Sequence, residues 1–463
     1  MSYDPVRYTP LTFHDAVPRF LDGSDTPRAY LERCLAVIAQ REPVVRAWVT
    51  LNEEGARRSA DESTRRYRAG RPLSSIDGLP LGVKDLIHTK DLPTGMGSDL
   101  YKDNHTHTDS AAIRALRDAG AIILGKTVTT ELGMSHPGPT TNPFDPSRTP
   151  GGSSSGSAAV VGAGMVPAAI GTQVVGSIIR PAGFCANYAL KPTYGAINRG
   201  ERQGYSQSHF GVHAGCLRDM WQVAVEMARR AGGDPGHPGL YGGVELPPPE
   251  RPTRLIVMEG QGWDSVDGQA KEGFERLLDA LRKAGVQILR RSDNRAIEAF
   301  EASIADCMAL CRDICGYELR WSLENLVERH GNVLSESMMG RLALSRKMDI
   351  DDYRALLRQR AAMHRCHEDL AGVGDAIISL SSLGPAPLMG DASGSDPGIA
   401  HTTGSPVMNA PSSALWAPAI SVPMLAVRAM PVGVQIMGQR HGDERLARLA
   451  GWLRQNVQPV SIH

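Results

Sequence analysis

The sequence has no excess of charge of either sign. Lysine and arginine number 50, aspartate and glutamate also number 50, and the formal net charge is zero. Without a positive field, a protein is not expected to bind nucleic acid or an anionic membrane surface as its main ligand. Aromatic residues are also scarce, at 5% of the chain, whereas hydrophobic residues make up 41%. This composition is typical of a globular protein with a large aliphatic core.

Cysteine is sparse as well. Seven cysteines in 463 residues are too few, and odd in number, for a disulfide framework. The first 23 residues contain no apolar segment behind a basic one, so we expect no secretory signal and a cytoplasmic location. Residues 150–179 carry no charge and could span a bilayer by length, but their serines, Thr172, Gln173 and Pro167 are too polar for lipid. We interpret this run as buried backbone of a soluble protein.

Helix, glycine and strand alternate along the chain. Residues 110–119 predict a helix behind a capping Thr108 or Asp109, Gly120 ends it, and residues 121–124 predict a buried strand. The same order recurs at residues 269–289. Such alternation predicts an α/β fold with a central sheet covered by helices. Further strands are expected at residues 80–87, 255–258, 376–380, 419–422 and 432–437, and helices at 26–67 and over most of 295–370.

Two histidines suggest a metal site. His105 and His107 alternate as metal ligands on a strand do, because every second side chain of a strand points the same way. A metal-dependent hydrolase using this pair is one hypothesis. The alternative is that both are exposed loop residues before a helix.

Two Gly/Ser clusters are the strongest chemical signal. Residues 151–157 read GGSSSGS, residues 171–177 read GTQVVGS, and an apolar run separates them. Successive backbone N–H groups in such loops can form an anion-binding nest, and Ser177 would stand beside it. The alternative is a seam of small residues where a helix packs tightly on a sheet. Composition alone leaves both interpretations open.

The residues of these clusters resemble the amidase signature family. The likeness extends from residue 150 to 195, ending in Ile178-Ile-Arg-Pro-Ala-Gly-Phe-Cys185 and Leu190-Lys-Pro-Thr-Tyr-Gly195. It continues upstream in Gly78-Leu-Pro-Leu-Gly-Val-Lys-Asp85 and in residues 119–127, and weakly in residues 431–438. The resemblance implies one large domain at residues 71–463, with the core motif at 150–195 and a variable helical insert at about 236–370. Residues 1–70 would form a helical preface packed on it.

The resemblance also implies a catalytic triad. Ser177 would be the nucleophile, Ser153 a bridging serine after a cis peptide bond, and Lys84 the base. The N–H groups of Val174, Val175 and Gly176, together with that of Ser177, would form the oxyanion hole. Gly152, Ser154 and Gln173 would bind substrate or support the site. The resemblance implies no metal or organic cofactor, and it implies a homodimer.

Physical chemistry is consistent with these roles. A serine hydroxyl becomes a good nucleophile only when a neighbour takes its proton, and a lysine can do this only when neutral. Lys84 lies in an apolar segment, where burial lowers the pKa of a lysine, although Asp85 would oppose this if it faced the same way. Lys126 and Lys191 compete for the role of base, but only Lys84 lies at the family's position.

Some positions depart from the usual family pattern. Gln173 stands where an aspartate is usual, Val174 and Val175 replace smaller residues, and the arginine comes one place later, at Arg180. The valines should narrow and dry the pocket around the acyl group. Residues 203–213 and 390–405 are expected to line the pocket, from their place in the family's fold.

Together these observations predict an amidohydrolase. It would hydrolyse the C–N bond of a small amide, urea or carbamate through an acyl-enzyme. One alternative is the glutamine-splitting subunit of a tRNA-dependent amidotransferase. The others are the metal-dependent hydrolase using His105 and His107, and a binding protein without activity.

Overall fold

The computed structural model describes residues 2–134, 136–200, 205–331, 333–391 and 402–463. Its helices are α1 (Val17–Asp22), α2 (Pro27–Val45), α3 (Glu53–Arg68), α4 (Ala111–Asp118), α5 (Ser155–Gly162), α6 (Ile179–Phe184), α7 (Leu217–Ala231), α8 (Gly268–Lys283), α9 (Arg295–Ser303), α10 (Cys307–His330), α11 (Glu336–Ser345), α12 (Ile350–Glu368), α13 (Ala410–Ala414) and α14 (Asp443–Asn456). Its strands are β1 (Trp48–Leu51), β2 (Pro80–Lys84), β3 (Ile122–Thr127), β4 (Ala168–Gln173), β5 (Tyr188–Lys191), β6 (His209–Ala214), β7 (Arg254–Val257), β8 (Gln287–Leu289), β9 (Ala376–Leu380), β10 (Ala419–Val427), β11 (Met430–Met437) and β12 (Val460–Ile462).

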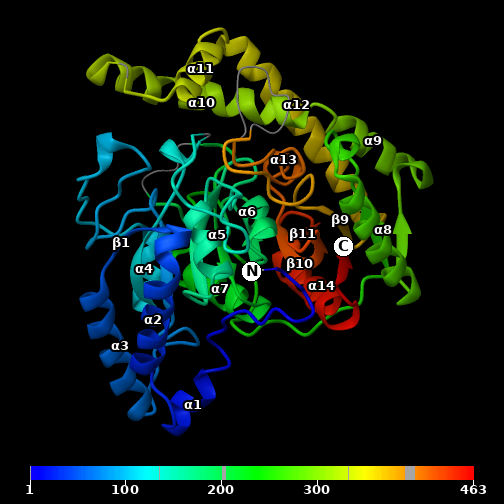
Figure 1. Cartoon of the computed structure of the whole chain (residues 1–463). Coiled ribbons are helices and arrows are strands. Elements are labelled where there is room, and N and C mark those ends of the chain that lie inside the picture. Colours follow the sequence, from blue (N-terminus) through cyan, green and yellow to red (C-terminus); the bar gives the residue numbers. More distant parts are fainter. Residues whose placement is uncertain (1, 135, 201–204, 332, 392–401) are drawn as a thin grey trace.

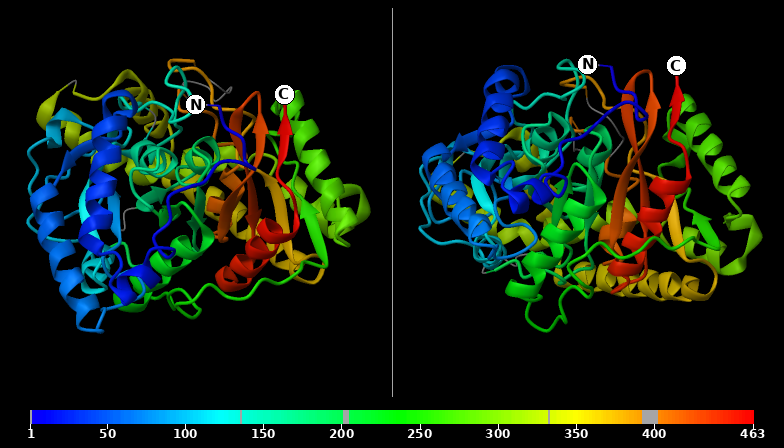
Figure 2. Two further views of the ribbon diagram at one scale, coloured as in Figure 1. Left: turned by 60° about the horizontal axis from the view of Figure 1, so that its bottom comes forward. Right: turned by 90° about the horizontal axis from the view of Figure 1, so that it is seen from below.

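All the described strands form one mixed sheet. Their order is β1-β3-β2-β4-β6-β5-β10-β11-β9-β7-β8, and β12 pairs with β10 beside this path. Strand β2 is parallel to both β3 and β4, whereas β4, β6, β5, β10, β11 and β9 pair antiparallel in turn. The N-terminal helices therefore lie at one end of the molecule and α8 at the other, with the C-terminal strands between them (Figures 1 and 2).

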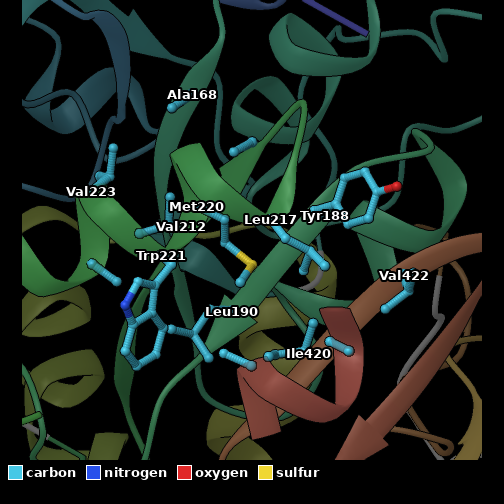
Figure 3. Close-up of a cluster of buried hydrophobic side chains, with 14 of the residues drawn as sticks. Ala168, Tyr188, Leu190, Val212, Leu217, Met220, Trp221, Val223, Ile420 and Val422 are labelled. Carbon is cyan, nitrogen blue, oxygen red and sulfur yellow. The ribbon is translucent and has the colours of Figure 1, made fainter. Parts of the chain in front are cut away.

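Helices cover both faces of this sheet. Helices α4, α7, α8 and α14 pack on one face, whereas α5, α6, α9 and α13 pack on the other. The side chains of β4 alternate between the two faces: Ala168 and Ile170 pack with α4 and α7 on the first face, and Ala169 packs with α5 on the other. Figure 3 shows the core beneath α7, where Trp221 and Met220 meet Leu190 and Val212 of the sheet. The predicted α/β fold, with helices on both faces, is confirmed.

The observed elements differ from the sequence prediction in three places. The side chain of Ser110, rather than Thr108 or Asp109, caps α4 by accepting from the N–H of Ile113. Residues 1–70 are not purely helical, because β1 pairs antiparallel with β3 and forms the edge of the sheet. Strands β4, β5 and β6 were not foreseen, since the alanines and glycines of β4 and β6 carry little β-propensity and β5 has only four residues. Pairing with neighbouring strands compensates for this weak local preference.

Helices α10, α11 and α12 form an arm above the sheet (Figure 1). Residues of α10 line one wall of a cavity of about 860 Å³, which is also lined by residues at or just after the ends of β2 and β4. In the described part of the chain, no helix combines the length and the apolar character needed to cross a membrane.

Candidate active site

Two parallel strands bring the candidate residues to one edge of the sheet. Lys84 is the last residue of β2, and Gln173 is the last residue of β4. Because the two strands pair in parallel, their carboxyl ends meet at the same edge. The loop that leads into α5 supplies Ser153 at this edge. Segments far apart in sequence thus bring Lys84 and Ser153 together.

Lys84 is fully buried and faces hydroxyl groups. Its Nζ lies 2.7 Å from Oγ of Ser153 and 2.8 Å from Oγ1 of Thr172, and it also contacts the Thr172 carbonyl oxygen at 3.3 Å. Burial lowers the pKa of Lys84 well below the usual lysine value. A neutral Lys84 amine can accept a proton from Ser153, which is what a general base in this position must do.

Asp85 does not oppose this effect, because it faces away from Lys84. Its Oδ1 lies 3.1 Å from Nζ of Lys126, and both side chains are buried. Nζ of Lys126 also donates to the carbonyl oxygens of Ile87 and Pro93. The contacts of Lys126 therefore stabilise the segment that follows β2, and Lys126 is not placed to act as a base.

The third buried lysine, Lys191, lies elsewhere. Its Nζ donates to the carbonyl oxygen of Pro192, and burial lowers the pKa of Lys191 to about 7. Ser153 and Ser177 each line a cavity, and Lys191 lines neither of the two.

The peptide bond between Gly152 and Ser153 is cis. The Gly152 carbonyl oxygen accepts from Nη2 of Arg180 at 2.6 Å. Ser154, one residue further, is fully buried and links the loop to β4: its Oγ donates to the Thr172 carbonyl oxygen and accepts from the Thr172 N–H. Gly152 and Ser154 thus help to fix the position of Ser153. Both residues are absent from the walls of the two cavities.

Gln173 organises the loop at residues 174–177 from behind. Its Oε1 accepts from the N–H groups of Ile178 and Ile179, and its Nε2 donates to the Val175 carbonyl oxygen and to Oγ of Ser413. The side chain is fully buried, so it supports the loop and does not face the cavities. Within the described residues, the backbone N–H groups of Val174, Val175, Gly176 and Ser177 donate no hydrogen bond. These four donors remain available for an oxyanion.

Ser177 is the last residue of this loop. Within the described parts of the chain its hydroxyl is hydrogen-bonded to no other side chain, and it is partly exposed. Residues 149–180 are otherwise buried apart from Gly164, Val174 and Val175. The backbone run is thus buried, as its composition predicted, and is open chiefly where Ser177 and the two valines line a cavity.

Two cavities meet at the serines. The larger, of about 860 Å³, is lined by Ser153, Thr172 and residues of α10. The smaller, of about 60 Å³, is lined by Ser177, Val175 and Arg180. Gly133, Met134 and Val174 line both, so the two cavities are neighbours. We refer to them as the large chamber and the small chamber.

Both interpretations of the Gly/Ser clusters have a counterpart in the structure. A Cβ at Gly156 would lie 2.4 Å from backbone atoms of Ala47 and Val128, so this glycine permits the close packing of α5. The second cluster ends at the small chamber instead.

The two histidines are not brought to the chambers. His105 and His107 are exposed on a loop, where their rings stack 5.7 Å apart. Among the described residues, the one group of three side chains with metal-binding spacing is His14, Cys216 and Asp219. There Asp219 accepts from the N–H groups of Phe13 and His14, which fastens the N-terminal segment to α7.

Sequence reasoning missed several residues of the site. Thr172 contacts Lys84, and Met134 lines both chambers. Thr172 lies within the second Gly/Ser cluster, but no role was predicted for it, and Met134 lies in no pattern that signals one. Of the segments expected to line the pocket, Tyr205, Ser208 and Phe210 line the large chamber and Thr403 the small one. Residues 203–204 and 392–401 lie outside the described residues.

Comparison with known proteins identifies relatives along almost the whole chain. The family model described as Amidase matches residues 29–447. The glutamyl-tRNA(Gln) amidotransferase subunit of Chloroflexus aggregans is 30% identical over 95% of each chain. A crystal structure of an amidase has 27% identity and a TM-score of 0.84, covering 96% of this chain and 100% of the other. A bacterial aryl acylamidase, at 19% identity and a TM-score of 0.82 over 97% and 96% of the chains, shares the fold.

Proposed function

The chain belongs to the amidase signature family, and from this premise we propose that it hydrolyses the C–N bond of a small amide, urea or carbamate through Lys84, Ser153 and Ser177. Membership makes it an amidase-family hydrolase acting on C–N bonds. The observation that carries the proposed triad is the 2.7 Å contact between Nζ of Lys84 and Oγ of Ser153, at a lysine whose pKa is lowered by burial.

The first half of the reaction attaches the substrate carbonyl carbon to Ser177 as a tetrahedral intermediate, which becomes the acyl-enzyme when the amine leaves. Neutral Lys84 takes a proton from Ser153, which takes one from Ser177, and Oγ of Ser177 attacks the amide carbonyl carbon. The N–H groups of Val174, Val175, Gly176 and Ser177 stabilise the oxyanion. Each such donor lowers the barrier by about 3 kcal/mol in enzymes of this kind.

The second half releases both products. Ser153 passes its proton to the nitrogen of the leaving amine as the C–N bond breaks, and Lys84 then returns a proton to Ser153. A water molecule, deprotonated by the same route, attacks the ester of Ser177 and frees the carboxylic acid. No step uses a metal or an organic cofactor.

The direct test is to trap the acyl group. Mass spectrometry of the protein mixed with a reactive amide or p-nitrophenyl ester should show one acyl adduct, on the peptide that contains Ser177. The adduct should disappear in Ser177→Ala and persist in Ser265→Ala, a matched change at an exposed serine that lines neither chamber. An adduct that survives Ser177→Ala would overturn the assignment of the nucleophile.

A second candidate function follows from the curated relatives. The Chloroflexus aggregans protein and the Geobacillus kaustophilus protein, each 30% identical, are both named as a subunit of glutamyl-tRNA(Gln) amidotransferase. The chain would then release ammonia from glutamine for a partner protein. Ammonia release from glutamine that exceeds release from other primary amides would favour this role over a stand-alone amidase.

The metal-dependent alternative has a simple discriminating test. Activity that resists a strong chelator and is lost in Ser177→Ala supports the serine mechanism, whereas loss with the chelator and in His105→Ala would support a metal site. The homodimer implied by the family remains part of the proposal, and analytical ultracentrifugation tests it.

A further inference from the structure

The two chambers adjoin at the proposed reaction centre, where each is lined by a different serine. Ser153 lines the large chamber and Ser177 lines the small one, with Val174 between them. In the proposed cycle Ser153 protonates the leaving nitrogen, so that nitrogen must face the large chamber. The other substituent of the carbonyl carbon, the acyl chain, must then extend into the small chamber.

The small chamber limits the length of this acyl chain. Its volume is about 60 Å³, and one water-sized atom occupies roughly 10–15 Å³ on this measure. About four or five non-hydrogen atoms therefore fit beyond the carbonyl carbon. The large chamber, at about 860 Å³, has the size of a site for a drug-sized ligand.

Arg180 contributes a buried guanidinium group to the small chamber. Its side chain is only 4% exposed, and one of its nitrogens, Nη2, donates to the Gly152 carbonyl oxygen and to Oγ1 of Thr403. Its other two nitrogens, Nε and Nη1, are buried and have no hydrogen-bond partner among the described residues. A buried guanidinium normally pairs with an anion or fills its hydrogen bonds, because burying an unpaired charge is costly.

The surroundings of Arg180 increase this demand for an anion. Burial lowers the pKa of Arg180 to about 9, which measures how strongly the site disfavours an uncompensated positive charge. Arg312 and Arg341 line the same chamber, and Arg312 pairs with Asp313. Of the described residues that line the chamber, none is an aspartate or a glutamate.

The large chamber has a different character. Apolar side chains form much of its wall, among them Leu86, Leu132, Phe210, Leu319 and Leu323. Two of its charged residues are in ion pairs, Arg199 with Asp234 and Asp109 with Arg117. The other two are hydrogen-bonded: Glu318 accepts from the Tyr353 hydroxyl, and Arg329 donates to the Asn325 carbonyl oxygen. This chamber suits an apolar amine such as an aromatic one.

We propose that the substrate is the monoamide of a short dicarboxylic acid with an apolar amine, whose free carboxylate binds Arg180 in the small chamber. This inference rests on the proposed amidase function and names its substrate class. One or two carbons between the scissile carbonyl and the carboxylate give four or five atoms, which matches the volume. The reaction consumes one water: the C–N bond breaks, the amine leaves with the proton from Ser153, and the free dicarboxylate results.

The test uses pairs of anilides that differ only in charge. Malonanilic and succinanilic acids carry the carboxylate, whereas acetoacetanilide and 4-oxo-N-phenylpentanamide carry a methyl ketone of nearly the same shape. We expect kcat/KM to be at least 100-fold higher for the acids with the unaltered protein, and this ratio to fall below 10 in Arg180→Met. Arg180→Lys, which keeps the charge, should retain part of the preference. Arg454→Met, on α14, is the matched control and should keep all of it.

A loss of packing at Arg180 would lower both rates equally and leave the ratio unchanged, which would overturn its assignment as the carboxylate site. If Arg180→Met does not fold, thermal shifts of Ser177→Ala decide the question. The acids should then stabilise that variant and the ketones should not, and equal shifts would overturn the proposal.

The anilides should also react at least 10-fold faster than malonamic and succinamic acids, which have ammonia as the leaving group, and the reverse order would overturn the assignment of the large chamber. Equal hydrolysis of acids and ketones would contradict the proposed substrate class but not the amidase function. If no amide gave a product or a Ser177 adduct, both the substrate class and the amidase function would be contradicted.

Discussion

Nζ of Lys126 lies 3.1 Å from Oδ1 of Asp85, and this pair gives the neighbouring residues Lys84 and Asp85 opposite surroundings. Asp85 turns toward a positive charge, while Lys84 turns toward the hydroxyls of Ser153 and Thr172. The separation matters because a carboxylate beside Lys84 would favour its charged form and remove its capacity to act as a base. In the proposed mechanism the ion pair therefore supports catalysis by keeping Asp85 away from Lys84.

The change Asp85→Asn should destabilise the fold strongly. It leaves Lys126 buried without its counter-charge, and breaking one partner of a buried pair costs about 3–5 kcal/mol. Urea unfolding measures this loss. The control is Asp118→Asn, which breaks the exposed Arg114–Asp118 pair and should cost less than about 1 kcal/mol. A similar, small loss in both variants would contradict the structural role of the Asp85–Lys126 pair.

The activity should rise with pH through the lowered pKa of Lys84. Only the neutral amine can accept the proton of Ser153, and burial moves its pKa well below the usual 10.5. The ascending limb of kcat/KM against pH should therefore have its midpoint well below 10.5 and then reach a plateau. A limb centred near the ordinary lysine value would show that Lys84 is charged at neutral pH.

The same shift predicts a pH-dependent stability. At a pH between the lowered pKa of folded Lys84 and 10.5, the unfolded chain binds a proton that the folded chain does not, so the free energy of unfolding rises with pH across this window. Lys84→Met removes this penalty. The stability of Lys84→Met relative to the unaltered protein should thus be greatest at the low end of the window and shrink toward pH 10.5. A difference that is constant with pH would contradict the shift.

Thr172→Val should move the pH profile as well as the rate. Oγ1 of Thr172 accepts a hydrogen bond from Nζ of Lys84 at 2.8 Å, and this acceptor favours the charged amine. Its loss should shift the ascending limb to lower pH and reduce kcat about 10-fold, since one hydrogen bond to a charged group is worth roughly 1.5–3 kcal/mol. Thr172→Ser, which keeps the hydroxyl, should retain the original limb. An unchanged limb in Thr172→Val would show that this contact does not tune Lys84.

The sequence predicted the fold best where local patterns are strong. The β-branched run before Gly125 and the apolar run after residue 375 predicted β3 and β9, and the lack of charge at residues 150–179 predicted that this run is buried. Strands β4 and β6 escaped prediction because half or more of their residues are alanine, glycine or histidine, and β5 escaped because it has only four residues. Pairing with neighbouring strands decides their conformation.

Much of the candidate site could not be predicted from single positions. Thr172 is hydrogen-bonded to Lys84, and Arg180 to Gly152. These partners are distant in sequence, and no spacing in the chain predicts such contacts. The orientation of Asp85 was left open by the sequence, because the residue after a strand can turn to either side. The three-dimensional position of Lys126 decides it.

Gln173→Ala should lower kcat more than it changes KM. The side chain makes four hydrogen bonds that shape the loop at residues 174–177, and none of them reaches the chambers. Misplacing an oxyanion donor costs about 10²–10³ in kcat, so we expect a loss of about 100-fold. Ser413→Ala removes the bond from Nε2 of Gln173 and the bond from Oγ of Ser413 to the Val175 carbonyl oxygen, but keeps both bonds to the N–H groups of Ile178 and Ile179, and should cost less than 10-fold. Equal effects of the two changes on kcat would show that Gln173 acts only as part of the general packing.

Val175→Ala should lengthen the acyl chain that the small chamber accepts. Val175 lines this chamber beside Ser177, and the change removes two methyl groups without altering the backbone N–H. Glutaranilic acid is longer than succinanilic acid by one methylene, so its kcat/KM relative to succinanilic acid should rise about 10-fold, as one methylene in an apolar pocket is worth about 1–3 kcal/mol. Val49→Ala, at an exposed position on β1, makes the same chemical change outside the site and should leave the ratio unaltered. If the ratio in Val175→Ala matched that control, the acyl chain would have to lie elsewhere, and the division of the substrate between the two chambers would be wrong.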